Sequence, residues 1–176
     1  MGIMASSFTK EKNMDLPPAI ILRALSDSDR SWCRGKMIEL WGAEIVIAHG
    51  EIFQPAELPG FVAEARGEAI GLLTYQLSEA GCEIITIDSW REGIGIGTRL
   101  IESARQAAVL NKCKRLWLVT TNDNLHALGF YQKRGFVLCA VRLNVFEKHR
   151  LLKPEIPQVG ESGIPIRDEL ELEMVL

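Results

Sequence analysis

The chain has 176 residues, of which 47% are hydrophobic and 24% are charged, and its formal net charge is -3. This length suits one domain of ordinary size, which can bury a core without disulfides or a structural metal. The small negative charge excludes a global positive field that would recruit nucleic acid or an anionic membrane. We therefore expect neither of these as a partner.

The cysteines predict free thiols in a reducing compartment. They are far apart, and none forms a CxxC pair or a zinc-ligand spacing with a histidine. The sequence also has no secretory h-region and no apolar run of about eighteen residues. We expect a cytoplasmic protein that binds no metal. The cysteines are Cys33, Cys82, Cys113 and Cys139.

The chain is expected to consist of a short lead-in and one domain. Residues 1–17 are polar and run into a pair of prolines, which predicts a flexible lead-in. We find no internal repeat and no second domain, so residues 18–176 are expected to form the single domain.

Apolar runs separated by turn residues predict five strands in the first half of the domain. A helix is expected between the first two strands, after cap residues at 26–29, and Gly42 is its expected end. The last three strands are joined by short turns and should be antiparallel neighbours. The five strands are expected at residues 19–25, 44–49, 61–65, 69–77 and 82–88.

The second half of the domain begins with a helix at residues 98–111, whose apolar residues recur at helical spacing. The nearly continuous apolar run at 115–120 predicts a central strand, joined by that helix to a parallel neighbour at 82–88. A second helix is expected at about 124–134. Gly135 is expected to end it.

The C-terminal part is expected to hold two more strands, at residues 136–146 and 168–175, with a loop rich in proline and glycine between them. In the last strand, apolar residues alternate with acidic ones, which predicts a half-exposed strand with a solvated acidic face. The acidic residues are Glu169, Glu171 and Glu173.

A glycine-rich segment, residues 93–98, joins a predicted strand directly to a predicted helix. Glycine adopts backbone conformations that other residues avoid, so successive amides here can point inward and bind an anion. The helix macrodipole adds positive potential at the same place. A phosphate or pyrophosphate is the most natural ligand, and a turn without ligand is the alternative.

Two well-known phosphate loops do not fit this segment. The dinucleotide fingerprint G-x-G-x-x-G fails, because its last position falls on Thr98 or Leu100. The nucleoside-triphosphate loop fails because no Gly-Lys-Ser or Gly-Lys-Thr follows.

The sequence Gly-Ile-Gly-Thr at 95–98, running into Arg-Leu-Ile, resembles the acetyl-CoA loop of the GNAT acetyltransferase superfamily. Residues 118–136 resemble the second GNAT signature, in which an asparagine, here Asn124, opens a helix that ends in Phe-Tyr-x-x-x-Gly-Phe. Both segments occur in the order and spacing of the family. The resemblance covers about residues 19–146.

The resemblance implies an α/β (α+β) fold, with a mixed, mostly antiparallel twisted sheet and helices on both faces. A central parallel strand pair would be splayed to hold acetyl-CoA, the cosubstrate. The implied activity is transfer of its acetyl group to a primary amine by direct attack.

The resemblance also implies roles for individual residues. The amides of the glycine loop would hold the pyrophosphate, the end of the preceding strand would bind the pantetheine arm, and Asn124 would lie beside it. Tyr131 would be the general acid that reprotonates the CoA thiolate, although an aromatic core residue is the alternative. The cofactor-binding residues implied are Ile87, Asp88, Ile94, Gly95, Ile96, Gly97, Thr98 and Asn124.

The acceptor amine must lose a proton before it attacks, because a free alkylamine is protonated near neutral pH. A nearby carboxylate can remove this proton. Glu83 is the first candidate for this base and Asp88 the second; ordinary solvated strand residues are the alternative for both. Neither His49 nor His149 lies in a paired arrangement in the sequence.

One position departs from the family pattern. Where the family usually has Gln or Arg before the glycines, this sequence has Glu92. A carboxylate would repel a pyrophosphate, so we expect it to point outward. Arg91 and Arg99 are candidate phosphate contacts instead.

Several questions stay open at this level. The acceptor is either a small-molecule amine or a peptide, in which case the protein would acetylate lysines or N-termini. The alternative to an enzyme is a CoA-binding regulatory module without turnover. The loop at 147–168 either shapes acceptor specificity or contributes to a homodimer. Aromatic residues that either line an acceptor pocket or pack in the core are Trp41, Phe53, Phe61 and Trp90.

Overall fold

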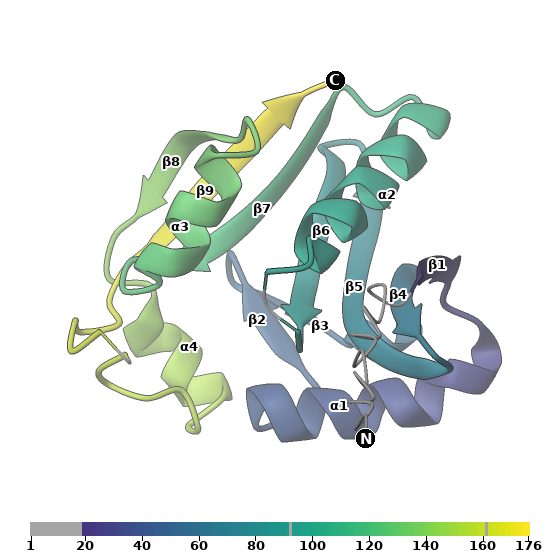
Figure 1. Ribbon diagram of the computed structural model, residues 1–176. Coiled ribbons are helices and arrows are strands. Elements are labelled where there is room, and N and C mark those ends of the chain that lie inside the picture. Colours follow the sequence, from purple (N-terminus) through teal and green to yellow (C-terminus); the bar gives the residue numbers. More distant parts are fainter. Residues whose placement is uncertain (1–18, 92, 161) are drawn as a thin grey trace, which may run out of the picture.

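The computed structural model describes residues 19–91, 93–160 and 162–176 (Figure 1). The predicted lead-in and Glu92 therefore lie outside the described residues. The described chain forms a seven-stranded sheet with strand order β1-β4-β5-β6-β7-β9-β8 and a separate two-stranded hairpin, β2-β3.

The elements have the following bounds. The sheet contains β1 (Ile20–Ala24), β4 (Gly60–Ala65), β5 (Glu68–Ser78), β6 (Gly81–Ser89), β7 (Arg115–Thr121), β8 (Val137–Arg142) and β9 (Glu169–Val175). The hairpin contains β2 (Val46–Ala48) and β3 (Glu51–Phe53). The helices are α1 (Arg30–Trp41), α2 (Ile96–Leu110), α3 (Leu125–Gln132) and α4 (Phe146–Leu152).

Glycines in the left-handed region fix two helix boundaries. Gly42 (φ 76°) ends α1, as predicted, and its N–H donates to the Ile38 carbonyl at 3.0 Å. Gly95 (φ 80°) precedes α2, which begins at Ile96 rather than at the predicted Thr98. The first turn of α2 is therefore part of the glycine-rich segment.

The sheet combines an antiparallel meander with one parallel pair. Strands β4, β5 and β6 are consecutive antiparallel neighbours, as the short turns predicted. Strand β7 is parallel to β6 and is joined to it by α2, so the predicted crossover is confirmed. Strand β9 lies between β7 and β8 and is antiparallel to both.

The parallel pair stays together for only part of its length. Strand β6 pairs with β7 through Cys82–Leu116, Glu83–Trp117 and Ile84–Leu118, and no further pair follows in the described chain. The register between β5 and β6 shifts at this point, which leaves Ile85 as an extra residue in β6. Such a bulge bends its strand, and the two strands diverge beyond it (Figure 1).

Both faces of the sheet are covered. Helices α2 and α3 lie in front of the sheet in Figure 1 and bury Ile84 and Leu118. On the opposite face, the β2-β3 hairpin packs on Ile85 and Val119, and α1 packs on Leu72 and its neighbours. The predicted fold class, a mixed and mostly antiparallel sheet with helices on both faces, is confirmed.

The strand predicted at 136–146 is present, but its predicted C-terminal end is wrong. Strand β8 ends at Arg142, and the chain then turns through Asn144, which has a positive φ of 57°. The Asn144 N–H donates to the Asp168 carboxylate at 2.8 Å, which holds this turn in place. Helix α4 follows, with Phe146 and His149 buried at helical spacing.

The prediction of a solvated acidic face on β9 is also wrong. Glu169 is 2% exposed and Glu171 is 6% exposed, whereas Glu173 is half-buried, and arginines of the two neighbouring strands pair with these carboxylates. Arg142 of β8 forms ion pairs with Glu169 and Glu171. Arg115 of β7 pairs with Glu171 at 2.9 Å and with Glu173 at 2.8 Å.

We predict that Arg142→Met lowers the free energy of unfolding by about 2 to 3 kcal/mol, because it leaves the buried Glu169 carboxylate without its cation, whereas Glu171 keeps Arg115. The matched control is Arg105→Met on α2, whose pair with Glu102 is solvent-exposed and should matter little. Urea denaturation of both variants measures the difference. Equal, small changes would mean that the β9 carboxylates do not need Arg142.

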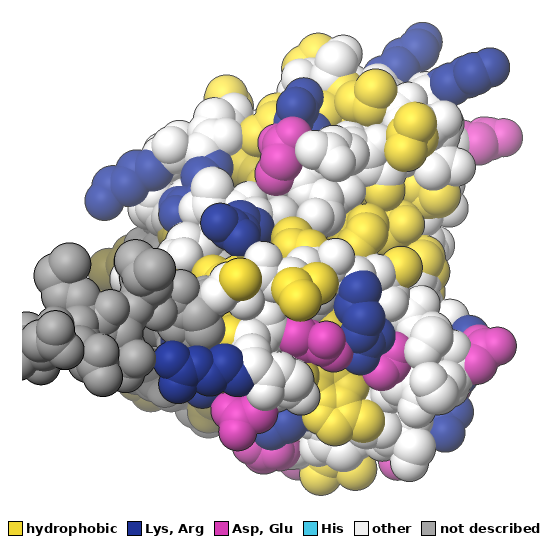
Figure 2. Space-filling model, turned by 45° about the vertical axis from the view of Figure 1, so that its right-hand side comes forward, with side chains coloured by type: hydrophobic (Ala, Val, Ile, Leu, Met, Phe, Trp, Pro, Cys, Tyr) yellow, Lys and Arg dark blue, Asp and Glu magenta, His cyan; other side chains and the backbone are white. Residues whose placement is uncertain are grey.

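The surface carries mixed charge. Figure 2 shows basic, acidic and hydrophobic side chains interspersed on one face of the molecule. In the part of the chain that the structure describes, no helix has the length and apolar character that a membrane span requires. All four cysteines are free thiols, as predicted, and Cys33 and Cys82 are buried.

Candidate active site

A cavity of about 960 Å³ occupies the place where β6 and β7 separate. Its lining includes Ile84 and Leu118 from the face covered by α2 and α3, and Ile85 and Val119 from the face covered by the hairpin. The cavity therefore reaches both faces of the sheet through the gap between the two strands. This geometry allows two ligands to meet from opposite faces.

The glycine-rich segment lines one end of this cavity with the N-terminus of α2. Gly95, Ile96, Gly97 and Thr98 all contribute to the lining, whereas the side chain of Ile94 is 40% exposed. The first amides of a helix have no partner within the helix and carry the positive end of its dipole. The segment is therefore suited to bind phosphate groups.

The two glycines at this helix start have different roles. A Cβ at Gly95 would meet no atom, so packing does not require a glycine there. The left-handed backbone conformation of this residue does. Gly97 is needed for packing, because a Cβ there would lie 2.7 Å from Cζ of Phe130 on α3. The second glycine thus keeps α3 against α2, beside the predicted phosphate site.

Arg134, which the sequence did not single out, supplies a positive charge at this helix start. Its Nε and Nη2 donate to Oγ1 of Thr98 at 2.9 and 2.7 Å, and its guanidinium lies 3.4 Å from the ring centre of Phe130. Arg134 also lines the cavity. The sequence feature that could have identified Arg134 is its place in the Phe-Tyr-x-x-Arg segment, at the end of the second GNAT signature.

The two arginines proposed from the sequence are placed differently. Arg91 lines the cavity and pairs with Glu68 at 3.1 Å. Arg99 donates to the Ile20 carbonyl of β1 at 3.2 Å instead. Glu92 lies outside the described residues, so its predicted outward orientation stays a prediction.

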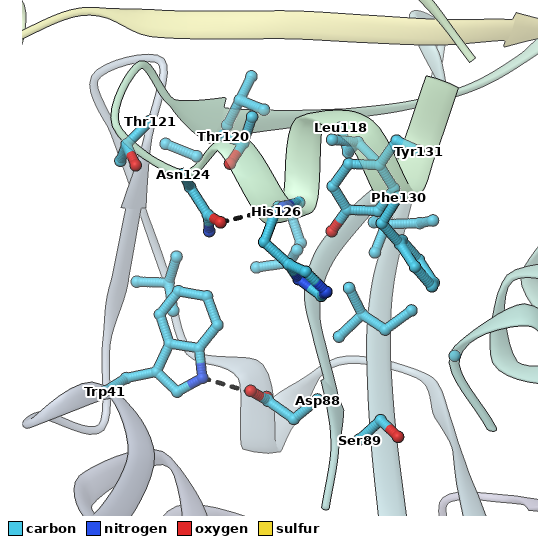
Figure 3. A pocket seen from close by; sticks show the side chains of 18 of the residues that line it. Trp41, Asp88, Ser89, Leu118, Thr120, Thr121, Asn124, His126, Phe130 and Tyr131 are labelled. Atoms are coloured by element: carbon cyan, nitrogen blue, oxygen red, sulfur yellow. Dashed lines mark hydrogen bonds between the residues drawn. The ribbon is translucent and has the colours of Figure 1, made fainter. Parts of the chain in front are cut away.

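The free end of β6 contributes Ile87 and Asp88 to the cavity. One carboxylate oxygen of Asp88 accepts a hydrogen bond from the indole N–H of Trp41 at 3.1 Å (Figure 3). Burial raises the pKa of Asp88, and the bond from Trp41 offsets this only in part. Among the described residues, no basic side chain forms an ion pair with Asp88.

Helix α3 presents Asn124 and Tyr131 to the cavity. Asn124 caps the helix, because its Oδ1 accepts from the Ala127 N–H at 3.1 Å. The Tyr131 ring is buried against Phe130 and Phe136, with its hydroxyl on the cavity side of the ring (Figure 3). Burial, helped by the charge of Asp88, raises the pKa of Tyr131, so this phenol keeps its proton at neutral pH.

Glu83 lies earlier in β6, is buried, and is not among the described residues that line the cavity. Its carboxylate oxygens lie 3.0 and 3.1 Å from Nε2 of His49. Burial raises the pKa of Glu83, and the bond to Glu83 raises the pKa of His49. The view that His49 is unpaired was therefore wrong, since the hairpin turn brings it onto β6.

Residues 22–136 match the acetyltransferase (GNAT) family. The chain belongs to the GNAT acetyltransferase family. Two proteins of Bacillus subtilis (strain 168) without a described function are similar to it. YdhI is 49% identical over 138 residues, which cover 77% of this chain and 86% of that protein. YxbD is 44% identical over 133 residues, which cover 75% and 84%.

Solved structures agree at the level of the fold. The IAA acetyltransferase from Bacillus cereus ATCC 14579 superposes with a TM-score of 0.70 at 22% identity, over 90% of this chain and all (100%) of the other. A GNAT family acetyltransferase from Elizabethkingia anophelis with acetyl-CoA bound gives a TM-score of 0.66 at 22% identity, over 89% and 98%. These structures support the fold, and the family match makes the protein an acetyltransferase of the GNAT family.

The segment after β8 forms a wall of the cavity in this GNAT protein. Phe146, Ile156 and Ile166 line it. The buried ammonium of Lys153 donates to the carbonyls of Trp41 at 2.8 Å and Ile45 at 3.1 Å, which fastens this segment to the end of α1. The predicted loop at 147–168 therefore borders the cavity.

Only one of the four aromatic residues considered from the sequence lines the cavity. Trp41 lies in its wall, whereas Phe53 belongs to the core of the hairpin. Phe61 stacks on Tyr75, and Trp90 packs edge-on against Trp32. Sequence alone could not separate them, because the contact between Trp41 and Asp88 joins residues far apart in the chain.

We predict that Arg134→Met raises KM for acetyl-CoA about tenfold, because a charge-assisted contact to phosphate is lost. S-acetylpantetheine has no pyrophosphate, so its kinetics should not change. The matched control is Lys133→Met, an exposed neighbour on the same turn. Steady-state kinetics with both thioesters tests this, and an equal loss with both would assign Arg134 a purely structural role.

Proposed function

We propose that this protein transfers the acetyl group of acetyl-CoA to the primary amine of an acceptor by direct attack. One observation carries the proposal. A single cavity joins a helix N-terminus flanked by Arg134 to a carboxylate, Asp88, and a phenol, Tyr131, where the parallel strands separate. The cavity thus combines an anion site with the acid and base that amine acetylation requires.

The residues present fit the cosubstrate. The amides of residues 94–98, with Arg134, would hold the pyrophosphate. Beyond Ile84, the edge of β6 that faces β7 has no strand partner in the described chain, so the backbone at Ile87 and Asp88 can pair with the amides of pantetheine as a strand would. Asn124 would lie beside this arm.

Tyr131 is the proposed general acid. When the new C–N bond forms and the C–S bond breaks, the electron pair leaves on sulfur, and the phenol donates a proton to it. Burial keeps this phenol protonated at neutral pH, so the proton is present for transfer. A buried, protonated tyrosine can also pack as a core residue, so both roles are compatible.

Asp88 is the better-placed base of the two candidates. Its carboxylate lines the cavity and has only a neutral donor, the Trp41 indole, as its described partner. The Glu83 carboxylate is already hydrogen-bonded to His49, and Glu83 is not among the described residues that line the cavity. We therefore propose that Asp88 takes the proton of the acceptor ammonium and that Glu83 is second to it.

The general test is release of CoA thiol from acetyl-CoA in the presence of amines, with detection of the acetylated product by mass spectrometry. We expect release that depends on the amine. The alternative of a regulatory module predicts CoA binding by calorimetry without amine-dependent release.

We predict that Tyr131→Phe lowers kcat by about 10²-fold or more, because the leaving thiolate loses its proton donor. The affinity for CoA, measured by calorimetry, should change little. Tyr75→Phe is the matched control, since Tyr75 is a buried tyrosine that stacks on Phe61 and is not among the described residues of the cavity lining. Small and equal effects of the two substitutions would remove Tyr131 from the mechanism.

A pH profile distinguishes the two bases. A protonated carboxyl cannot accept a proton, so kcat/KM should rise with pH as Asp88 ionises, at a pKa above the ordinary value of about 4. Asp88→Asn should abolish this rise and lower the plateau about 10²-fold. Glu83→Gln should retain the rise; if it abolishes the rise and Asp88→Asn does not, Glu83 is the base.

A further inference from the structure

We propose that the acceptor is a small primary amine with a single ammonium group and a hydrocarbon body. The inference rests on the proposed function. It assigns the ammonium to the Asp88 carboxylate and the body to the acceptor pocket, which is the part of the cavity on the hairpin side of the sheet. The pocket is lined by Val46, Ala48, Val119, Phe146, Ile156 and Ile166.

The Asp88 carboxylate has no cationic partner among the described residues. It is half-buried, it lines the cavity, and its partner among the described residues is the neutral indole N–H of Trp41. A desolvated carboxylate without a counter-ion is unfavourable, and an ammonium in the cavity would compensate it. The Trp41 indole, which is beside Asp88 in Figure 3, fixes the orientation of this carboxylate.

The walls beyond Asp88 are apolar and come from separate parts of the fold. Val46 and Ala48 belong to β2, Phe146 to α4 and Ile166 to the segment before β9, and each is less than 9% exposed. Such a wall favours methylene groups, each of which gains about fourfold in affinity when it leaves water.

The buried carboxylate of this pocket is already neutralised. Glu169 pairs with Arg142 at 3.1 Å and accepts the backbone N–H of His49 at 2.9 Å. The Lys153 ammonium donates to the Trp41 and Ile45 carbonyls. Glu155 also lines the cavity, but it is exposed to solvent. A second ammonium buried among the apolar side chains would therefore find no buried carboxylate to pair with.

The same lysine favours a small acceptor over a polypeptide. Its ammonium ties the C-terminal segment to the end of α1, so two separate segments are joined across this wall of the pocket. A wall joined in this way leaves less room for an extended chain than an open groove would.

Pentylamine and cadaverine test the inference, because they have the same length and differ only by a second ammonium. We expect kcat/KM to rise from propylamine to pentylamine and to fall at least about tenfold from pentylamine to cadaverine, since the second charge would be buried unpaired. Spermidine and a lysine-containing peptide should be poorer still. Thiol release with acetyl-CoA measures all five.

A matched pair of variants tests the position of the wall. Ile156→Asp places a carboxylate in the pocket and should shift the ratio of cadaverine to pentylamine upward by about tenfold. Leu151→Asp makes the same change on α4 where the side chain is 82% exposed and should leave the ratio unchanged. Thermal unfolding verifies that both variants are folded.

The outcomes separate the two proposals. Amine-dependent thiol release with cadaverine, spermidine or the peptide preferred over pentylamine overturns the hydrocarbon amine and leaves the acetyltransferase proposal intact. Binding of CoA without release for any acceptor overturns both.

Discussion

The site depends on the separation of β6 from β7 at the bulge around Ile85. A sheet interior normally pairs every backbone amide and carbonyl, and leaving such groups without partners is costly. Here the pairing ends at Ile84, so the edge of β6 is open to a ligand with amide groups, while residues of both faces reach one cavity. The bulge thus creates a binding edge and a passage together.

Charge in the cavity is arranged by the elements around this gap. The positive potential is at the start of α2, where Arg134 holds Thr98, and the Asp88 carboxylate at the end of β6 has no ion-pair partner among the described residues. The acids of β9 do not add to this negative charge, because Arg142 and Arg115 pair with them. In the proposed function, the phosphates of the cosubstrate would bind at the first of these sites and the ammonium of the acceptor at the second.

Local signals in the sequence predicted the glycine turn, the cap of α3 and most of the sheet. The glycine turn before α2, the Asn124 cap and the meander depend on neighbouring residues, so their patterns were sufficient. Helix α4 and the burial of Glu169 could not be predicted in this way. They depend on the insertion of β9 between β7 and β8, which the alternating pattern of β9 does not encode.

The acceptor half is built from long-range contacts that no local pattern marks. The contact of Trp41 with Asp88 spans 47 positions, and that of Lys153 with Trp41 spans 112. The match to the GNAT family ends at residue 136, before α4 and the segment that carries Phe146, Ile156 and Ile166. The family match therefore covers the glycine loop and α3 but not these C-terminal side chains, which line the pocket without contributing to the loop. In the proposed function, they are the side chains that would set the acceptor.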